Sequence, residues 1–431
     1  MNYYSTNNRS QKTSFKEAVI NGLAPDGGLY MPESIPLLPE DFFKGLHKFS
    51  LHKIAFEAMR AYIHTEVDDD ALEKIIHETF DFDIPLIRIE ENFFSLELFH
   101  GPTLSFKDVG ARFMARILSH LVRKEKKEIC VLTATSGDTG SAVANGFFGA
   151  EGIKVVILYP ENGVSEIQEK QMTTLGKNIS AIEIKGTFDD CQALVKKAFR
   201  DELLAKNISL TSANSINMAR LLPQMIYYYY ALAQTGERKP VTFSVPSGNF
   251  GNLTAGLIAK KMGLPANFVA GTNINDAFPN YLQSGNFVPH PSRKTISNAM
   301  DVGNPSNFFR ILDLYNNSLT EIKKDISSYI ISDDETKKTI KNVWTEKNYL
   351  LDPHGAVAYA ALMKYKQNQT GSTGIFLETA HPAKFKGTVE EVIGEKISLP
   401  GSLRKAMQKE KSTTKLSADF NELKEFLMRN K

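Results

Sequence analysis

Short apolar runs alternate along most of the chain with longer segments of helical periodicity. Runs that predict buried strands fall in two series, at residues 129–134, 154–159 and 179–184, and then at 241–245, 268–271 and 374–377. Apolar residues four apart predict the buried face of a helix at Val109, Phe113, Ile117 and Leu121. Because strands that alternate with helices form parallel sheets with crossover helices, the pattern predicts an α/β fold with two sheets and a cleft between them.

The two ends of the chain differ from this pattern. Helical periodicity dominates residues 51–80, so we expect residues 1–90 to form a mostly helical N-terminal domain. A last amphipathic helix is predicted around Leu423, within a helical C-terminal tail at residues 401–431. A length of 431 residues is enough for roughly two to three domains.

Composition narrows the choice of partner and compartment. The 51 basic and 49 acidic residues leave a net charge of +2, which argues against nucleic acid as the main partner. Two cysteines, Cys130 and Cys191, cannot make a disulfide framework, and no apolar run is long enough for a signal peptide or a membrane span. We therefore expect a cytoplasmic protein without a membrane partner. The histidines lack metal-ligand spacing, so no metal site is expected.

A lysine stands at the start of the central predicted helix. This helix is expected to begin near Ser105, a residue type that favours the N-cap. Lys107 then lies in the first turn, where the helix dipole disfavours a cation, and its neighbour Phe106 adds desolvation. Both effects lower the amine pKa, as lysines that form Schiff bases require. The alternative is an ordinary exposed lysine paired with Asp108.

A glycine-rich loop joins a predicted strand and helix in the second series. The loop is Pro246-Ser-Gly-Asn-Phe-Gly-Asn252. Its small residues let backbone amides approach an anion, and the following helix N-terminus adds donors and a favourable dipole. It matches neither a Walker A loop nor a dinucleotide fingerprint. The loop predicts a phosphate cradle, and the alternative is a plain glycine turn.

Two further stretches follow predicted strands. Thr133-Ala-Thr-Ser-Gly-Asp-Thr-Gly140 offers the hydroxyls and amides that hold a small carboxylate. Asp138 would repel an anion there unless it caps the helix or bonds elsewhere. The second stretch is Glu378-Thr-Ala-His-Pro-Ala-Lys384, at a strand end of the kind where α/β proteins bind ligands. Thr379 can donate a neutral hydrogen bond there, or it merely ends the strand.

Four of these strings occur in one order: Ser105-Phe-Lys-Asp108, Ser136-Gly-Asp-Thr-Gly140, Ser247-Gly-Asn-Phe-Gly-Asn252 and Glu378-Thr-Ala-His-Pro382. The combination resembles the fold-type II pyridoxal-phosphate (PLP) enzymes, and specifically the longer form of the threonine synthase family. The similarity runs from about residue 13 to about residue 395. It implies two open α/β sheet domains around a cleft and a small helical N-terminal domain. The large, PLP-binding domain would comprise residues 91–125 and 235–400, and the small domain residues 126–234.

The resemblance also implies roles for individual residues. Lys107 would carry PLP as a Schiff base and shuttle protons, and Thr379 would face the pyridine nitrogen. The cofactor phosphate would be held by Gly248, Asn249, Phe250, Gly251 and Asn252. The substrate carboxylate would be bound by Ser136, Gly137, Asp138 and Thr139. Because the implied substrate carries its own phosphate, a second anion site is required, with Arg112, Asn214, Ser215 and Arg220 as hypothetical ligands.

The implied reaction converts O-phospho-L-homoserine and water to L-threonine and phosphate, by γ-elimination and β-addition of water, as the last step of threonine biosynthesis. The chain would thus be a PLP-dependent lyase acting on a small molecule, as a monomer or homodimer. One alternative is another fold-type II lyase, such as serine/threonine dehydratase. Another is a catalytically silent relative that binds phosphorylated metabolites. The missing dinucleotide fingerprint argues against a nicotinamide dehydrogenase.

Overall fold

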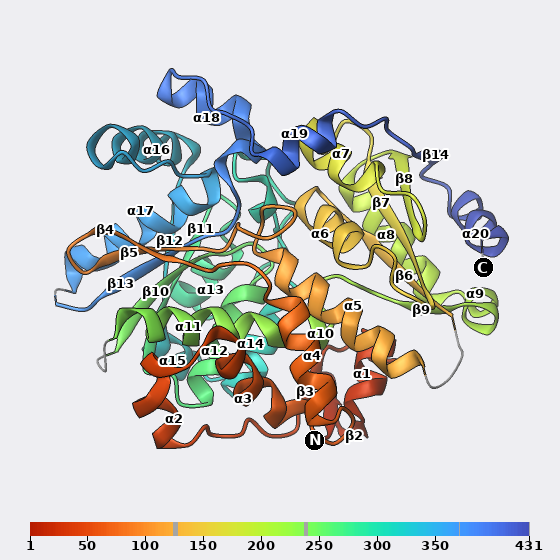
Figure 1. The fold of residues 1–431 in the computed structure, drawn as a ribbon, viewed down its shortest axis with the longest axis horizontal. Coiled ribbons are helices and arrows are strands. Elements are labelled where there is room, and N and C mark those ends of the chain that lie inside the picture. The colour runs from red at the N-terminus through yellow and green to blue at the C-terminus, as the bar shows by residue number, and fades with distance from the viewer. Residues whose placement is uncertain (124–127, 237–239, 370, 431) are drawn as a thin grey trace.

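Two β-sheets lie side by side in the computed structural model, with helices around them and the N-terminal region beneath (Figure 1). The structure describes residues 1–123, 128–236, 240–369 and 371–430. The predicted α/β fold with two separate sheets is confirmed. Among the described residues, none of the helices has both the length and the apolar character that crossing a membrane requires.

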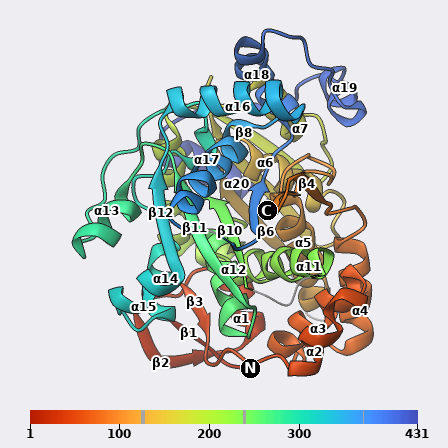
Figure 2. The same ribbon diagram turned by 90° about the vertical axis from the view of Figure 1, so that its left-hand side faces the viewer.

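The larger sheet has six strands in the order β12-β11-β10-β13-β5-β4. All neighbours are parallel except β4, which pairs antiparallel with β5 at the edge. Helices α16 and α17 cover one face and α11 and α12 the other (Figure 2). The strands are β4 Leu86–Glu90, β5 Phe93–Glu97, β10 Val241–Pro246, β11 Ala266–Thr272, β12 Ile326–Ile330 and β13 Gly374–Glu378. The helices are α11 Met225–Thr235, α12 Gly251–Lys261, α16 Asp333–Lys347 and α17 Pro353–Asn368.

The smaller sheet has five parallel strands in the order β14-β8-β7-β6-β9. Its outer strand β14 comes from the C-terminal tail, which was expected to be helical only. Its four residues are half exposed and give no alternating pattern, so the sequence does not reveal the strand. The strands are β6 Ile129–Ala134, β7 Ile153–Pro160, β8 Ile179–Lys185, β9 Ser209–Thr211 and β14 Thr414–Ser417. The accompanying helices are α6 Asp138–Gly146, α7 Glu166–Thr173, α8 Phe188–Arg200, α9 Glu202–Asn207, α19 Gly401–Met407 and α20 Phe420–Arg429, whereas α18 Lys386–Ile393 packs against α16.

The N-terminal region was expected to be mostly helical; besides its helices it contains a three-stranded antiparallel sheet, β2-β1-β3. Strand β2 is polar and largely exposed, which explains why the sequence pattern does not predict it. The elements are β1 Tyr3–Ser5, β2 Asn8–Thr13, α1 Phe15–Asn21, β3 Tyr30–Pro32, α2 Glu40–Gly45, η1 Leu46–Lys48, α3 Leu51–Ile63 and α4 Asp69–Thr79. Strand β4 also falls within residues 1–90, although it pairs in the larger sheet.

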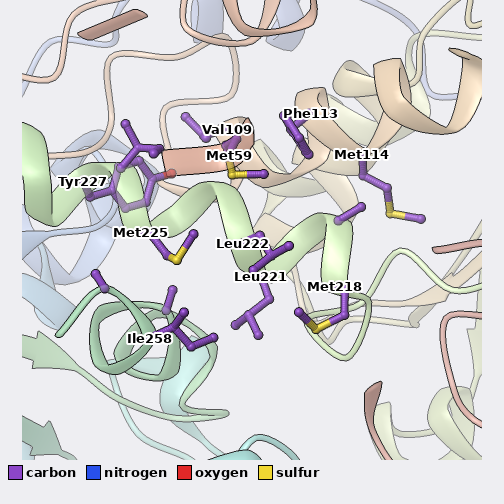
Figure 3. Close-up of a cluster of buried hydrophobic side chains, with 14 of the residues drawn as sticks. Met59, Val109, Phe113, Met114, Met218, Leu221, Leu222, Met225, Tyr227 and Ile258 are labelled. Carbon is purple, nitrogen blue, oxygen red and sulfur yellow. The ribbon is translucent and has the colours of Figure 1, made fainter. Parts of the chain in front are cut away.

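The long helix α5 (Lys107–Arg123) crosses the centre of the molecule. Its buried face, which includes Val109 and Phe113, packs in the main core with Leu222 and Met225 of the segment that leads into α11 (Figure 3). The helix begins at Lys107, two residues after the predicted cap, because Ser105 instead forms a β-bridge with Ala380. The remaining elements are α10 Met218–Leu221, η2 Leu222–Gln224, α13 Ala277–Ser284, η3 Asn298–Met300, α14 Phe308–Leu314, α15 Leu319–Asp325 and η4 Pro382–Phe385.

The predicted domain limits fall at different kinds of position. The limit between residues 125 and 126 lies outside the described residues. The predicted boundary between residues 234 and 235 falls inside α11, just before the last residue of that helix.

Candidate functional site

The carboxyl ends of strands from both sheets open onto one cavity of about 1490 Å³. The last residues of β6 and β7 line it from the smaller sheet, and the last residue of β10 and Thr379, which follows β13, line it from the larger one. The predicted site residues that line the cavity are Lys107, Ser136, Asp138, Thr139, Asn214, Ser215, Arg220, Gly248, Asn249, Phe250, Gly251, Asn252 and Thr379. Gly137 and Arg112 do not belong to its wall. The sequence motifs thus converge, although they are far apart along the chain.

Lys107 is fixed against the end of β13. The backbone amide of Phe106 donates to the carbonyl of Thr379 at 2.9 Å, and the amide of His381 donates to the carbonyl of Leu104 at 3.1 Å. The hydroxyl of Tyr227 donates to the carbonyl of Phe106 at 2.5 Å. These bonds hold the first residue of α5 beside Thr379.

Burial lowers the pKa of Lys107 to about 8; Asp138 raises it, while Lys384 and Arg220 lower it further. The lowered pKa agrees with the sequence argument, although burial is the main cause. Asp108 turns away and accepts from the hydroxyl of Thr103 at 2.6 Å and from its backbone amide at 2.9 Å. A neutral amine is therefore accessible near physiological pH.

The glycine-rich loop after β10 is held rigidly at the cavity wall. A Cβ atom on Gly248 would lie 2.6 Å from the Cα of Met300, so only glycine fits there. Phe250 caps α12 with a left-handed φ of 61°. The Asn249 side chain accepts from the amide of Ser306 at 2.6 Å and donates to the hydroxyl of Ser215 at 2.6 Å. The loop therefore presents its backbone to the cavity at close range.

Asn252 supplies a donor without a partner. Its Oδ1 accepts from the hydroxyl of Tyr228 at 2.6 Å, which orients the amide group. Its Nδ2 is buried at the cavity wall and has no hydrogen-bond partner in the described parts of the chain. The first amides of α12 are likewise without intrahelical partners. Together with the close approach at Gly248, these donors fit the phosphate group of a cofactor.

The loop after β6 has the same construction. Thr135 Oγ1 accepts from the amides of Gly137 at 2.9 Å and Gly140 at 2.8 Å, which shapes the turn into α6. Gly137 caps the helix with a φ of 138° and lies behind the cavity wall. Ser136 and Thr139 face the cavity. The helix N-terminus and two hydroxyls suit a small carboxylate.

Asp138 bonds elsewhere, which is one of the two possibilities that the sequence left open. Its Oδ1 lies 2.7 Å from Nζ of Lys384 and accepts from Nε2 of Gln168 at 2.8 Å. Burial alone would raise the pKa of Asp138, but Lys384, Lys107 and Gln168 outweigh it and hold the pKa well below its usual range. The sequence did not single out Lys384 or Gln168, because nothing in the local pattern distinguishes a buried lysine or glutamine from an exposed one.

Arg220 brings a second buried cation to the cavity. Its Nη1 donates to the carbonyl of Ala213, and its Nε is buried without a partner among the described residues. Burial lowers its pKa to about 10. Ser215 and Asn214 line the same wall, and the side-chain oxygen Oδ1 of Asn214 accepts from the hydroxyl of Thr133. These groups can hold an anion next to the glycine-rich loop.

Arg112 was a hypothetical ligand of this second anion site, and the structure corrects that expectation. Its guanidinium donates to the carbonyls of Thr79 at 3.2 Å and Glu78 at 2.5 Å, and to the carboxylate of Asp81. All three acceptors lie at the end of α4, away from the cavity. The helix turns Arg112 to a different face from Lys107 because five residues correspond to about one and a half turns.

Two tyrosines of the run at residues 227–230 support the site from behind. Their rings pack in the core, and the hydroxyl of Tyr227 holds Phe106 and that of Tyr228 holds Asn252. The run of four identical residues was visible in the sequence, although the direction of each hydroxyl was not.

Comparison with known families covers nearly the whole chain. A family described as "Threonine synthase N terminus" matches residues 2–80, one described as "Pyridoxal-phosphate dependent enzyme" matches residues 82–377, and one described as "Threonine synthase, C-terminal" matches residues 355–427. The chain is 47% identical to a threonine synthase of Haemophilus influenzae over 433 residues, covering 100% of both chains. It is 43% identical to a threonine synthase of Escherichia coli, covering 99% of both chains.

Solved structures of the same family have the same fold as this chain. The crystal structure of the threonine synthase from Escherichia coli superposes with a TM-score of 0.93 at 42% identity, covering 100% of both chains. A PLP-bound threonine synthase from Brucella melitensis gives a TM-score of 0.93 at 34% identity, covering 100% of this chain and 99% of the other. Maize serine racemase shares the fold alone, with a TM-score of 0.56 at 16% identity over 73% of this chain and 93% of that one.

Proposed function

The chain belongs to the threonine synthase family of pyridoxal-phosphate-dependent enzymes, and on this basis we propose that it converts O-phospho-L-homoserine and water to L-threonine and phosphate. One observation supports this reaction most directly. Two groups of anion donors, at Asn252 and at Arg220, line the same cavity as Lys107. One can hold the phosphate of a cofactor and the other that of a substrate.

PLP, when bound, supplies an electron sink that stabilises a carbanion on the amino acid. The loop residues Gly248, Asn249, Phe250, Gly251 and Asn252 would hold its phosphate, and Lys107 would hold it covalently through Nζ. The hydroxyl of Thr379 would face its ring nitrogen. A hydroxyl cannot supply the proton that a carboxylic acid would, so the ring nitrogen would stay largely unprotonated.

The remaining residues would bind and orient the substrate. Ser136, Thr139 and the amides of residues 137–139 would hold its carboxylate at the N-terminus of α6. Arg220 would hold its phosphate together with Asn214 and Ser215, since a guanidinium binds phosphate through two hydrogen bonds.

Lys107 would move protons at the substrate carbons. A group with a pKa of about 8 can both accept and return a proton near neutral pH. Phosphate leaves from Cγ and water adds its hydroxyl at Cβ.

The test is to incubate the protein with PLP and O-phospho-L-homoserine and to follow threonine and inorganic phosphate together. Equimolar formation of both is expected, and Lys107→Ala should abolish it. Lys386→Ala is a matched control, because Lys386 also opens a helix but lies at the surface, outside the cavity. Its activity should stay unchanged.

Other products would contradict the proposal. Phosphate without threonine would indicate elimination to a keto acid and favour the dehydratase alternative. Neither product, with cofactor bound at Lys107, would favour a catalytically silent binder of phosphorylated metabolites.

Two finer expectations belong to the same proposal. We propose that the protein acts in the cytoplasm and that it is a monomer or a homodimer. Light scattering during size-exclusion chromatography measures the mass in solution, and a mass above that of a dimer would contradict the second expectation.

A further inference from the structure

A buried ion pair joins Asp138, in the loop that would bind the substrate carboxylate, to Lys384, which lies outside the cavity wall. Lys384, in η4, has a side chain that is 0% exposed, and Asp138 is 4% exposed. The Lys384 ammonium lies 2.7 Å from Oδ1 of Asp138 and donates to the carbonyl of Thr103 at 2.8 Å. Gln168 donates to the same Oδ1 at 2.8 Å. The carboxylate is thus held by one charged and one neutral donor.

The position of this carboxylate poses an electrostatic problem. Asp138 is the first residue of α6, where the helix dipole and the free amides attract an anion. A carboxylate fixed at that point repels a second one, and the repulsion is strong because the surroundings are buried. An uncompensated Asp138 would therefore weaken the site for the substrate carboxylate.

We propose that Lys384 is a positioning residue that neutralises Asp138 and thereby lets the loop at residues 136–139 bind the carboxylate of the substrate. This inference rests on the proposed function. Lys384 does not belong to the cavity wall, so it acts through Asp138 and not by contact with the substrate. Gln168 orients the same carboxylate oxygen without changing the charge.

The two members of the ion pair also have opposite effects on the pKa of the Lys107 amine. Asp138 from α6, Lys384 from η4 and Arg220 from α10 act on this amine, the first raising its pKa and the other two lowering it. Without Lys384, Lys107 would keep the attraction of Asp138 and lose one repulsion, and its pKa would rise. Neutralising both members of the pair would remove two opposed effects and leave the pKa near its present value.

The first experiment compares three variants of the holoenzyme by their KM for O-phospho-L-homoserine. Lys384→Met should raise KM by about tenfold or more, since it leaves a buried carboxylate uncompensated. The double variant Lys384→Met with Asp138→Asn should return KM to within about threefold of the wild type. Gln168→Leu is the matched control, because it removes a bond of similar length to the same oxygen without changing the charge, although it also removes the two bonds from Ser165 at the start of α7. Its KM should stay within about threefold of the wild type.

Equal losses in Lys384→Met and Gln168→Leu would overturn the proposal, and so would a double variant as impaired as the single one. If Lys384→Met does not fold, the KM of the double variant alone tests the proposal. A folded double variant with KM raised by about tenfold or more overturns the proposal, and one within about threefold supports it.

A second readout does not depend on turnover. The rate at which Lys107 of the apoenzyme is acetylated by acetic anhydride, followed by mass spectrometry at a series of pH values, gives the pKa of its amine. Lys384→Met should shift the midpoint upward by about one pH unit, and the double variant should reverse the shift. A purely structural role for Lys384 would leave the midpoint in place and would overturn the proposal. If the wild type makes no threonine, the proposed function fails, while this titration still tests the charge balance.

Discussion

A single methyl group at Gly248 tests whether the glycine-rich loop is a phosphate cradle. In Gly248→Ala the new Cβ would lie 2.6 Å from the Cα of Met300 and 3.0 Å from the carbonyl oxygen of Ala299. Both are backbone atoms of η3, and the amide of Ala299 is bonded to Nε2 of His354 at 3.2 Å. Because η3 is anchored, we expect the loop to move towards the cavity, into the space proposed for the cofactor phosphate.

The magnitude follows from the cost of overpacking. Extra methyl groups in well-packed sites cost about 1–3 kcal/mol. Since about 1.4 kcal/mol corresponds to a tenfold change in affinity, the dissociation constant for PLP should rise by about 5- to 150-fold. Gly251→Ala should cost less, because its Cβ would lie at 3.3 Å from the Cβ of Ser215. Gly387→Ala is the matched control, since a Cβ there meets nothing within 4 Å in the parts of the chain that the structure describes.

The assay is a titration of each apoprotein with PLP, followed by the absorbance of the bound cofactor. Thermal unfolding of the apoproteins shows whether a variant is simply less stable. The expected order of affinity is wild type and Gly387→Ala first, then Gly251→Ala, then Gly248→Ala. A stable Gly248→Ala protein that binds PLP within about twofold of the wild type would refute the assignment of the cradle.

Three further predictions concern the buried charges. Arg220→Met should lower kcat/KM for O-phospho-L-homoserine by about 10- to 150-fold, through loss of a charged hydrogen-bond donor. Arg112→Met should instead lower the free energy of unfolding by about 1–3 kcal/mol and leave KM unchanged, and a raised KM there would contradict the placement of Arg112 at α4. Burial and then Asp352 raise the pKa of Glu378 well above its ordinary value. Between the unfolded pKa of about 4.3 and this higher value the folded state binds one proton more, so stability falls as pH rises. Glu378→Gln should make that fall shallower by up to about 1.4 kcal/mol per pH unit in denaturant unfolding, and an unchanged slope would contradict it.

The sequence predicted those parts of the fold that depend on local periodicity. Strands such as Ile129–Ala134 are buried on both faces and therefore read as continuous apolar runs, which made their bounds visible. Strand Thr414–Ser417 is half exposed, so the tail was expected to be helical only. Its pairing with β8 is a contact between segments more than two hundred residues apart, which no local pattern encodes.

The same distinction applies to the site. Loops between strand and helix could be recognised because their function requires glycine and hydroxyl residues at fixed local positions. Partners that come from other segments of the chain could not be recognised, because Lys384 and Gln168 have no special sequence context. Whether Arg112 or Arg220 faces the cavity depends on tertiary packing, which the sequence does not show. Asp138 connects the two cases. A carboxylate within an anion-binding loop conflicts with its surroundings, so Asp138 was expected either to cap the helix or to bond elsewhere, and the structure identifies Lys384 as a bonding partner. A local conflict in a sequence can therefore predict that a distant partner exists, although only the fold can say which residue it is.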